Sequence, residues 1–518
     1  MSSASESDEE LPLNLTDVPD NPLPDDFLPT TIGAQATDIV KSLLAQARHR
    51  DDNIEPFSEQ QSFLSETELS EDWASPSLKS EGFSGSAEFV DWQQHRLHVF
   101  VLSDAGKPVY SRHGDESHLA SIMGVMQALV SFVAAAGDEL QSIEADDRTF
   151  VFLCKPPLIL VAVGQPMECR AHLLVCLNYV YNQILSLLTL KRLKQRFELQ
   201  QNLDLRRLLS GDSRLISSIV DFTQDAPGAF LQAVSYIPMS VANRDQVAQI
   251  ISQSVKSPTL VFGMLAHRHH LVALVCMKGH TLLPLDLHLI MNMISSSEQL
   301  KSGQTHWLPI CLPQFDANGF MYAHISFLDE ATSLILLSVD STEFYALDEA
   351  KNKIFQRLKS AQNGELLRSI WSAEFPTISS IGAPEVRHMV CKLVPVSQYV
   401  STEWAVPYST SLSTDFPSDQ RIYPLERFTS GADESRHEIL STYRRLHARL
   451  HNPDYPTRFV FQTTPTEGFA AWRIDAFEFY ITLEPLTTKI TLNVLRKTLL
   501  RWIQSRKTHL FALSTPNF

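Results

Sequence analysis

The chain has 518 residues, 44% of them hydrophobic, and a formal net charge of −16. A chain of this length is too long for one hydrophobic core, so we expect two to four domains. Its six cysteines occur singly, without a C-x-x-C pair. This spacing is typical of reduced thiols in a cytosolic protein, and it argues against a disulfide framework or a cysteine-based zinc site.

The excess negative charge is confined to the first 92 residues. Residues 1–92 hold 20 acidic and 4 basic side chains, whereas the remaining chain holds 39 of each. The segment is also rich in serine and contains five prolines from Pro12 to Pro29. Such a composition buries too little apolar surface to fold, so we expect a disordered acidic tail that phosphorylation could regulate. The neutral remainder argues against nucleic-acid binding, which requires an excess of basic side chains.

A first folded module begins near Arg96. Alternating or continuous apolar runs bounded by turn residues predict strands, and longer apolar stretches rich in Ala, Leu and Met predict helices. The predicted order is strand, strand, helix, three strands, helix. The strands are Arg96–Leu102, Pro108–Arg112, Leu140–Ala145, Arg148–Cys154 and Pro157–Gly164, and the helices are Leu119–Ala136 and Met167–Leu188.

The same order recurs in two further modules. The strands of the second are Pro258–Leu265, His270–Cys276, His306–Cys311, Gly319–Leu328 and Ser333–Val339, with helices Leu285–Ser297 and Phe344–Leu358. The third begins with one strand and a Pro- and Ser-rich insertion. Its strands are Val386–Val394, Arg458–Thr463, Phe469–Asp475, Phe477–Leu483 and His509–Leu513, with helices Glu434–Leu450 and Ile490–Arg506.

Three units of similar order and about 120 residues each make a structural repeat. We therefore predict an α+β protein of three domains, each an antiparallel sheet with flanking helices. The expected bounds are 1–92 for the acidic tail, 93–210 for the first domain with a basic bridge helix, 211–360 for the second domain with preceding helices, and 380–518 for the third domain with a disordered insertion at 407–429.

The sequence motifs of common enzymes are absent. There is no G-x-x-x-x-G-K-[ST], G-x-G-x-x-G, G-x-S-x-G or H-E-x-x-H, and the 18 glycines are about half the usual share. Gly106 and Lys107 look like part of a phosphate loop, but Pro108 follows them and a hairpin turn explains the pair. We expect no bond-making or bond-breaking chemistry and no cofactor.

Two groups of histidines have spacings that can hold a metal ion. His267, His269 and His270 lie at a predicted hairpin tip, and His447 and His451 lie four residues apart on one helix. No cysteine or carboxylate is seen to complete either group, and a solvated turn or a basic helix face explains them without an ion. We predict no metal site.

The helix predicted at Leu119–Ala136 has no Asp, Glu, Lys or Arg from Ser117 through Gly137. Its apolar run approaches the length of a membrane span, but polar residues interrupt it and predicted strands flank it. A helix that lies on a sheet and otherwise faces water carries charges on its outer side. Another surface therefore covers this helix, either a second protein, which we favour, or other domains of the same chain.

The bridge helix predicted at Leu190–Ser210 is basic and amphipathic. Such a helix can lie on anionic lipid, although basic side chains are more often a solvated face, and Glu198 and Asp204 are interleaved here. The candidate membrane contacts are Lys191, Arg192, Lys194, Arg206 and Arg207.

Several stretches resemble the SAND family of vacuolar fusion proteins (Mon-one, named for monensin sensitivity). They are Val99–Arg112 (VFVLSDAGKPVYSR), Ile122–Phe132 (IMGVMQALVSF), Tyr181–Leu188 (YNQILSLL), Asp204–Gly211 (DLRRLLSG), Pro284–Leu289 (PLDLHL) and Phe477–Tyr480 (FEFY). The resemblance runs from about Leu97 to Phe511, and its first two stretches are the most specific. The tail and the insertion do not share in it.

The resemblance implies three longin domains and a partner, a second tri-longin subunit named for calcium, caffeine and zinc sensitivity. It implies that the pair is an exchange factor for the late-endosomal, lysosomal Rab GTPase (Rab seven), recruited peripherally to endosome and lysosome or vacuole membranes by an early-endosomal Rab and phosphatidylinositol 3-phosphate. A trafficking adaptor or tether without exchange activity is the alternative. The opening residues, rich in serine and acid, do not look like a secretory signal, so we expect a cytoplasmic protein without a transmembrane segment.

In the family, the paired first longin domains form the exchange site. The resemblance therefore suggests residues of the first module as contacts with the partner subunit or the Rab, and it leaves inward-facing residues such as Val99 and Leu160 to the core. The candidate contacts are Gly106, Lys107, Tyr110, Met123, Gly124, Met126, Gln127 and Ser131.

Overall fold

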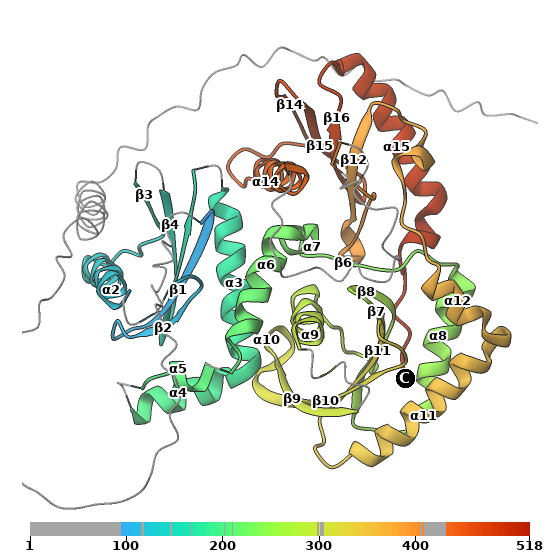
Figure 1. Cartoon of the computed structure of the whole chain (residues 1–518), viewed down its shortest axis with the longest axis horizontal. Coiled ribbons are helices and arrows are strands. Elements are labelled where there is room, and N and C mark those ends of the chain that lie inside the picture. The colour runs from blue at the N-terminus through green and yellow to red at the C-terminus, as the bar shows by residue number, and fades with distance from the viewer. Residues whose placement is uncertain are drawn as a thin grey trace, which may run out of the picture. The chain divides into compact units, whose positions relative to one another are not determined.

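The structure is a computed structural model that describes residues 95–518, apart from 115, 117–118, 146–147, 167, 201–202, 210, 298–299, 301–304, 405–406 and 409–430. The tail expected over 1–92 and most of the insertion expected over 407–429 therefore lie outside the described residues. All described residues belong to one structural unit, Phe57–Phe518. Within it, three sheets with flanking helices follow one another along the chain (Figure 1).

The first sheet has five antiparallel strands in the spatial order β2-β1-β5-β4-β3. Side chains of β1 alternate, so that Val99 and Val101 join the core beneath α3, and α2 covers the other face (Figure 1). The elements are β1 (Leu97–Ser103), β2 (Pro108–Ser111), α2 (Ala120–Ala135), β3 (Ser142–Ala145), β4 (Arg148–Lys155), β5 (Leu158–Gly164) and α3 (Arg170–Leu188).

The second sheet repeats this arrangement in the order β8-β7-β11-β10-β9, again antiparallel throughout. The strands are β7 (Leu260–His267), β8 (His270–Cys276), β9 (His306–Leu312), β10 (Ala317–Phe327) and β11 (Thr332–Ser338). The helices are α8 (Val241–Ser254), α9 (Pro284–Ser296), α10 (Pro313–Asp316), α11 (Phe344–Ser360) and α12 (Glu365–Trp371), with a 3₁₀ turn η3 (Ala361–Gly364), whereas α13 (Ile378–Ile381) packs in the core of the third domain.

The third sheet has the order β14-β15-β16-β12-β13, with a short sixth strand, β6, added in parallel beside β13. The elements are β6 (Val234–Ser235), β12 (Val386–Leu393), the 3₁₀ turn η4 (Val394–Val396), β13 (Gln398–Ser401), α14 (Gly431–Leu450), β14 (Phe459–Thr463), β15 (Gly468–Ile474), β16 (Phe477–Leu483) and α15 (Lys489–Leu510). The prediction of an α+β protein of three domains, each an antiparallel sheet with flanking helices, is confirmed, and β6 is a parallel addition to the third sheet.

The last strand predicted, His509–Leu513, is wrong because α15 continues to Leu510. The reason lies on α8, where the buried guanidinium of Arg244 donates hydrogen bonds to the carbonyls of Thr508, His509 and Phe511 at 2.9–3.1 Å. These carbonyls at the end of a helix have no partner within the helix. A distant arginine therefore supplies the donors that allow the helix to run on.

The bridge between the first two domains is not one helix. It comprises α4 (Leu190–Leu199), α5 (Arg206–Leu209), α6 (Ser213–Asp225) and α7 (Pro227–Leu231). Helix α6 packs on the α3 side of the first sheet, where the hydroxyls of Tyr110 and Ser217 lie 2.8 Å apart. The domain boundary that we expected at residue 210 would divide α6 from the core to which it belongs. Phe230 of α7 packs instead in the core of the third domain.

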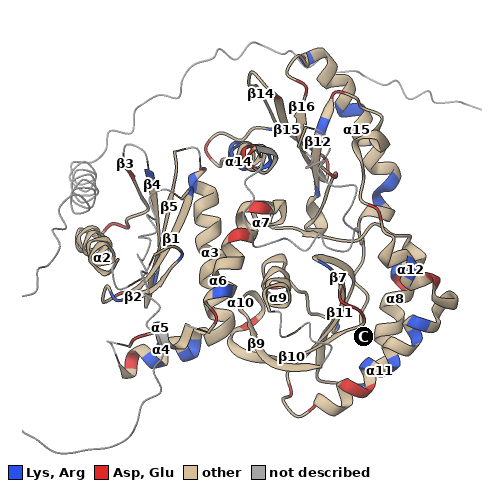
Figure 2. Ribbon diagram, in the orientation of Figure 1, with Lys and Arg blue, Asp and Glu red and all other residues tan. Residues whose placement is uncertain are grey.

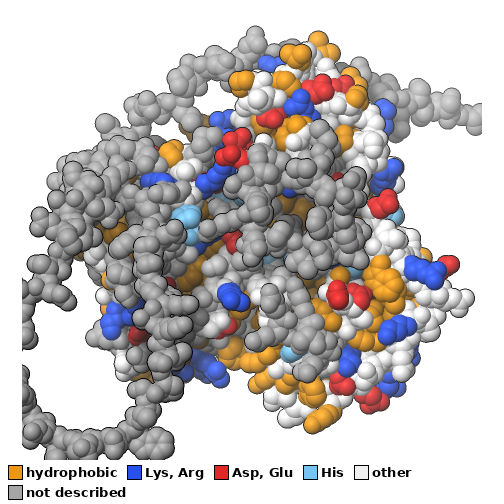
Figure 3. Space-filling model, viewed as in Figure 1, with side chains coloured by type: hydrophobic (Ala, Val, Ile, Leu, Met, Phe, Trp, Pro, Cys, Tyr) orange, Lys and Arg blue, Asp and Glu red, His pale blue; other side chains and the backbone are white. Residues whose placement is uncertain are grey.

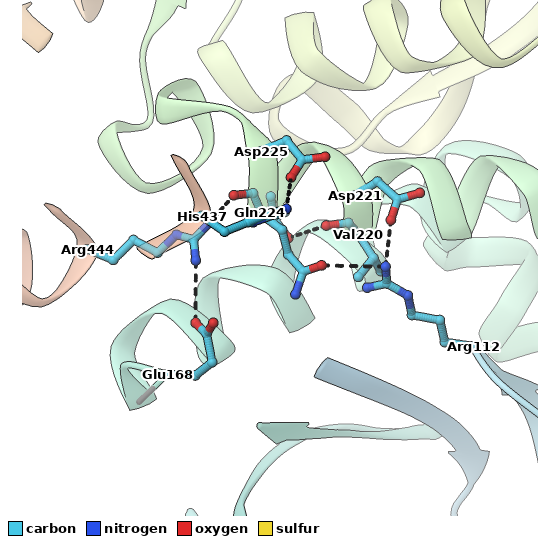
Figure 4. Close-up of polar contacts among 9 residues, drawn as sticks. Arg112, Glu168, Val220, Asp221, Gln224, Asp225, His437 and Arg444 are labelled. Atoms are coloured by element: carbon cyan, nitrogen blue, oxygen red, sulfur yellow. Dashed lines mark hydrogen bonds and ion pairs between the residues drawn. The ribbon is translucent and has the colours of Figure 1, made fainter. Parts of the chain in front are cut away.

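Helix α6 also joins the first and third domains through charged groups (Figure 4). The buried guanidinium of Arg444 on α14 donates to the carbonyl of Gln224 and lies 3.4 Å from the carboxylate of Glu168, which precedes α3. Two further pairs of side chains flank it on α6. Arg112 forms an ion pair with Asp221 at 2.5 Å, and His437 Nε2 lies 3.3 Å from the carboxylate of Asp225.

We predict that Arg444→Ala destabilises the protein by about 3–5 kcal/mol, because it leaves a largely buried carboxylate and a carbonyl without their partner. Chemical denaturation followed by tryptophan fluorescence measures the change. Arg449→Ala removes an exposed arginine from the same helix and is the control, with an expected change within about 0.5 kcal/mol. If the two substitutions lower the free energy of unfolding equally, the contacts of Arg444 with Glu168 and Gln224 do not stabilise the packing of α14 on α6.

Candidate functional site

Helix α2 has one buried side and one exposed side. Met123, Met126, Leu129 and Val133 pack on the first sheet. The opposite side is defined here as the α2 face and comprises Ser121, Gly124, Ala128, Ser131 and Phe132, of which Phe132 is 58% exposed. No charged side chain lies along α2 (Figure 2). The described domains of the chain leave this face uncovered, so the described structure does not support the interpretation that the chain's own domains hide it.

The Gly106 turn meets the α2 face. Gly106 has a φ of +74°, which only glycine adopts without strain, and its N–H donates to the Ser103 carbonyl at 2.8 Å. The side-chain amide of Gln127 donates to the carbonyl of Asp104 at 3.1 Å and to the Ser131 hydroxyl at 2.9 Å. The hairpin interpretation of Gly106 and Lys107 is confirmed by the pairing of β1 with β2. Turn and helix form one continuous surface.

Three of the eight candidate contacts do not lie on this surface. Met123 and Met126 are buried beneath α2, and Tyr110 is buried where its hydroxyl reaches α6 on the opposite side of the sheet. A second protein cannot touch them while the domain is folded. Gly106, Lys107, Gly124, Gln127 and Ser131 are partly or fully exposed, and a side chain at Gly124 would meet nothing within 4 Å. Val99 and Leu160 are fully buried, as expected.

The basic candidates do not form one strip. Lys191 and Lys194 are exposed on α4, whereas the Arg192 guanidinium lies 4.8 Å from the ring centre of Phe320 on β10. Arg206 pairs with Asp204 at 3.2 Å. The side chain of Arg207 lies outside the described residues. An open groove of about 500 Å³ runs between α4 and the second sheet, lined by Thr189, Lys191, Arg192, Gln195, Asn318, Phe320, Tyr322 and Val339.

Sequence reasoning missed an exposed apolar ridge at the start of α15. Leu486, Ile490 and Val494 are 90%, 80% and 64% exposed, at a spacing of four residues. Figure 3 shows hydrophobic side chains gathered over this end of the helix. The spacing is visible in the sequence, but α15 has a second apolar stripe, Leu492, Leu495 and Leu499, which is buried. Nothing local tells which stripe faces the sheet.

The two histidine groups differ in the structure. His267 bonds to Thr332 at 2.8 Å and His270 packs on the ring of Phe375, so the hairpin histidines do not converge. The expectation that no carboxylate lies beside His447 and His451 is wrong. Glu478 of β16 lies 3.2 Å from His451, and the three residues meet at one point. The carboxylate belongs to a different element, so spacing along α14 could not reveal it.

One described helix, α3, is long and apolar enough to cross a membrane. Its apolar window is 61% buried, because one side packs on the first sheet and another on α6. This is the environment of a core helix. The helix expected to pass such a test, α2, is shorter.

Models described as the first, second and third longin domains of FUZ, MON1 and HPS1 match residues 97–219, 258–356 and 385–507. Among solved structures, a bacteriophytochrome of R. palustris aligns with a TM-score of 0.15 and 9% identity over 79% of this chain and 96% of that one, which carries no argument.

Curated proteins match over most of the chain. "Vacuolar fusion protein MON1 homolog A" of Bos taurus is 38% identical over 425 residues, 82% of this chain and 72% of the relative. "Protein SAND" of Takifugu rubripes is 38% identical over 442 residues, 85% and 80% of the two chains. "Vacuolar fusion protein MON1 homolog B" of Homo sapiens is 32% identical over 465 residues, 86% and 80%. With its three longin domains, the chain belongs to the SAND/MON1 family of vacuolar fusion proteins.

Proposed function

We propose that the chain is one subunit, itself without bond-making or bond-breaking chemistry, of a heterodimeric guanine-nucleotide exchange factor for the late-endosomal, lysosomal Rab GTPase. The partner is a second tri-longin protein, the calcium-caffeine-zinc-sensitivity subunit. The pair would drive endosome maturation and fusion with the lysosome or vacuole. Family membership supports the trafficking role, and the exposed, uncharged α2 face is the observation that supports a partner on the first domain.

The α2 face needs a partner for a physical reason. A helix whose outer side faces water carries charged side chains there, and α2 has none along its 16 residues. Phe132 contributes a large aromatic surface near the C-terminal end of an otherwise small-residue face, and aromatic anchors dominate protein interfaces. Ser121, Gly124 and Ala128 let a partner's backbone approach closely. A second longin domain placed here would create a groove beside the Gly106 turn that neither domain offers alone.

An exchange factor of this kind makes no covalent bond. It binds the nucleotide-free GTPase more tightly than the loaded one, and by reciprocity it weakens nucleotide binding by the same factor. The switch segments that hold the nucleotide's phosphate and Mg²⁺ are the elements that it would displace. No enzyme active site is needed for this activity.

Recruitment to membranes would be peripheral. Lys191 and Lys194 are exposed on α4 and available to anionic headgroups such as phosphatidylinositol 3-phosphate, while an early-endosomal Rab would supply a second contact. Arg206 forms an ion pair with Asp204, so its charge is less available for contact with an anionic membrane. The alternative role, an adaptor or tether without exchange activity, has support from the apolar ridge at the start of α15, which offers a further surface for a protein.

Nucleotide release separates the two roles. We expect the complex of this chain and its partner to accelerate release of a fluorescent guanine nucleotide from the late-endosomal Rab, because the complex favours the nucleotide-free state. Stopped-flow fluorescence with each subunit alone is the control. Binding of the Rab by the complex without faster release would leave the adaptor role.

The double substitution Ala128→Glu and Phe132→Glu tests the α2 face. We expect loss of the heterodimer, since two unpaired carboxylates would be buried at several kcal/mol each, while the folded subunit keeps its melting temperature because both positions are exposed. Size-exclusion chromatography with the partner measures assembly. Tyr345→Glu, on exposed α11, is the control. An intact heterodimer in the double variant would refute the proposed interface.

The pair Lys191→Ala and Lys194→Ala tests the membrane contact. At about 1 kcal/mol for each basic side chain near an anionic surface, we expect roughly 30-fold weaker binding to vesicles that contain phosphatidylinositol 3-phosphate. Vesicle sedimentation measures it. Lys353→Ala with Lys359→Ala removes the same charge from exposed positions of α11. If both pairs weaken binding equally, α4 has no special role at the membrane.

A further inference from the structure

Three side chains that the proposed exchange activity does not use converge in the third domain. His447 lies in the last turn of α14, His451 directly follows the helix, and Glu478 reaches them from β16. Their nitrogen and oxygen ligand atoms all lie within 4.8 Å of one another. The centres of the two imidazole rings are 4.3 Å apart. Two elements that are separate in sequence thus bring two imidazoles and one carboxylate to a single point.

The spacing within this group is close to that of metal ligands. His451 Nε2 and Glu478 Oε2 are 3.2 Å apart. Two ligands at bond lengths of 2.0–2.1 Å in a tetrahedral zinc site are separated by about 3.3 Å. His451 and Glu478 therefore already stand at coordination distance, and only the imidazole of His447 has to turn toward them.

The three members of the group differ in exposure. The carboxylate of Glu478 is buried, His447 is half-buried and His451 is exposed. A metal ion bound here replaces the contact between His451 Nε2 and Glu478 Oε2, and the proton shared by that pair leaves to solvent through the exposed side of His451.

The hydrogen bonds around the group involve Glu478 Oε2, which lies against His451 Nε2 and the Tyr480 hydroxyl, and they leave Glu478 Oε1 and the imidazole of His447 available. Within the described part of the chain, Glu478 Oε1 is buried without a hydrogen bond, and the Nε atom of Arg473 lies 3.7 Å from it. The Tyr480 hydroxyl donates to Oε2 at 3.4 Å. Lys392 donates to the carbonyl of Leu231 at 2.7 Å, which directs its ammonium group toward α7. The imidazole of His447 makes ring contacts with Phe230 and Tyr480 and, among the described residues, no hydrogen bond.

We propose that His447, His451 and Glu478 bind a divalent transition-metal ion, zinc before others. Two imidazoles and one carboxylate are a zinc donor set, whereas Ca²⁺ and Mg²⁺ require oxygen ligands throughout. His451 is about one-third exposed, so the fourth coordination position opens to solvent or to a side chain of a bound partner. The ion ties the end of α14 to β16 and strengthens the third domain.

Zinc titration of the folded full-length chain tests the site. The sequence has 18 histidines, so weak zinc binding at other positions is expected. The test is therefore the difference in zinc affinity between the variants and the unsubstituted chain. We expect the tightest equivalent of zinc to bind at least tenfold more weakly in His451→Ala and in Glu478→Gln. His280→Ala, an exposed histidine of the second domain, is the control and should bind as the unsubstituted chain does.

Two further readouts separate a metal site from a structural ion-pair cluster. Zinc should raise the melting temperature of the unsubstituted chain and of His280→Ala, with reversal by a chelator, and Co²⁺ should give the intense visible absorption of a tetrahedral site. Neither effect should appear in His451→Ala, whose exposed side chain can be removed without unfolding. Equal zinc affinity in His451→Ala and the unsubstituted chain would overturn the proposal, as would absence of the Co²⁺ absorption.

Discussion

The arrangement of the first and third domains depends on the contacts of one buried guanidinium, that of Arg444. A buried cation is tolerated only where hydrogen bonds and an opposite charge replace its water. Arg444 finds them in Glu168 of the first domain and in the C-terminal carbonyl of Gln224 on α6. This requirement fixes α14 against α6. It also fixes His447, one turn further along α14, against β16, so the candidate metal ligands inherit their position from the same contact.

Three sheets with one strand order use their equivalent helices in different ways. Helix α9 of the second domain is buried on most sides, because α3 and α6 cover it and the hydroxyl of Tyr179 lies 2.8 Å from the His288 ring. Helix α14 of the third domain contacts α6 and α7. Of these three equivalent helices, α2 is the one whose outer side is exposed and uncharged in the described structure. The helices equivalent to α2 in the second and third domains, α9 and α14, are both packed against other helices of the chain. This comparison within one chain supports the view that a protein surface also packs on α2.

Hydrophobic periodicity predicted the order and approximate bounds of most strands and of the long helices, because sheet strands and core helices repeat with different periods. It did not predict the short elements β6, β13, α10, α12 and α13. It failed where distant residues decide. Hydrogen bonds from Arg244 extend α15 into the segment where a strand was predicted. The start of β13 was also missed, because Ser397 precedes it with a φ of +49°, a conformation that the sequence pattern of a non-glycine residue does not indicate. The same limit applies to the candidate interface. The lack of charge on α2 identified the helix, but it could not separate Met123 beneath it from Gly124 above it.

Glu478 illustrates how far such reasoning could have gone. Every residue of β16 from Phe477 to Leu483 is buried, so the strand has no water-facing side on which a carboxylate could lie. An acidic residue inside a run as apolar as FEFY must therefore meet positive charge, hydrogen-bond donors or a metal ion. A partner for the Glu478 carboxylate is therefore predictable from the sequence, but the identity of that partner is not. The partners, His447 and His451, stand at the end of a helix whose packing against β16 is set by tertiary contacts, and no spacing within either segment encodes their meeting.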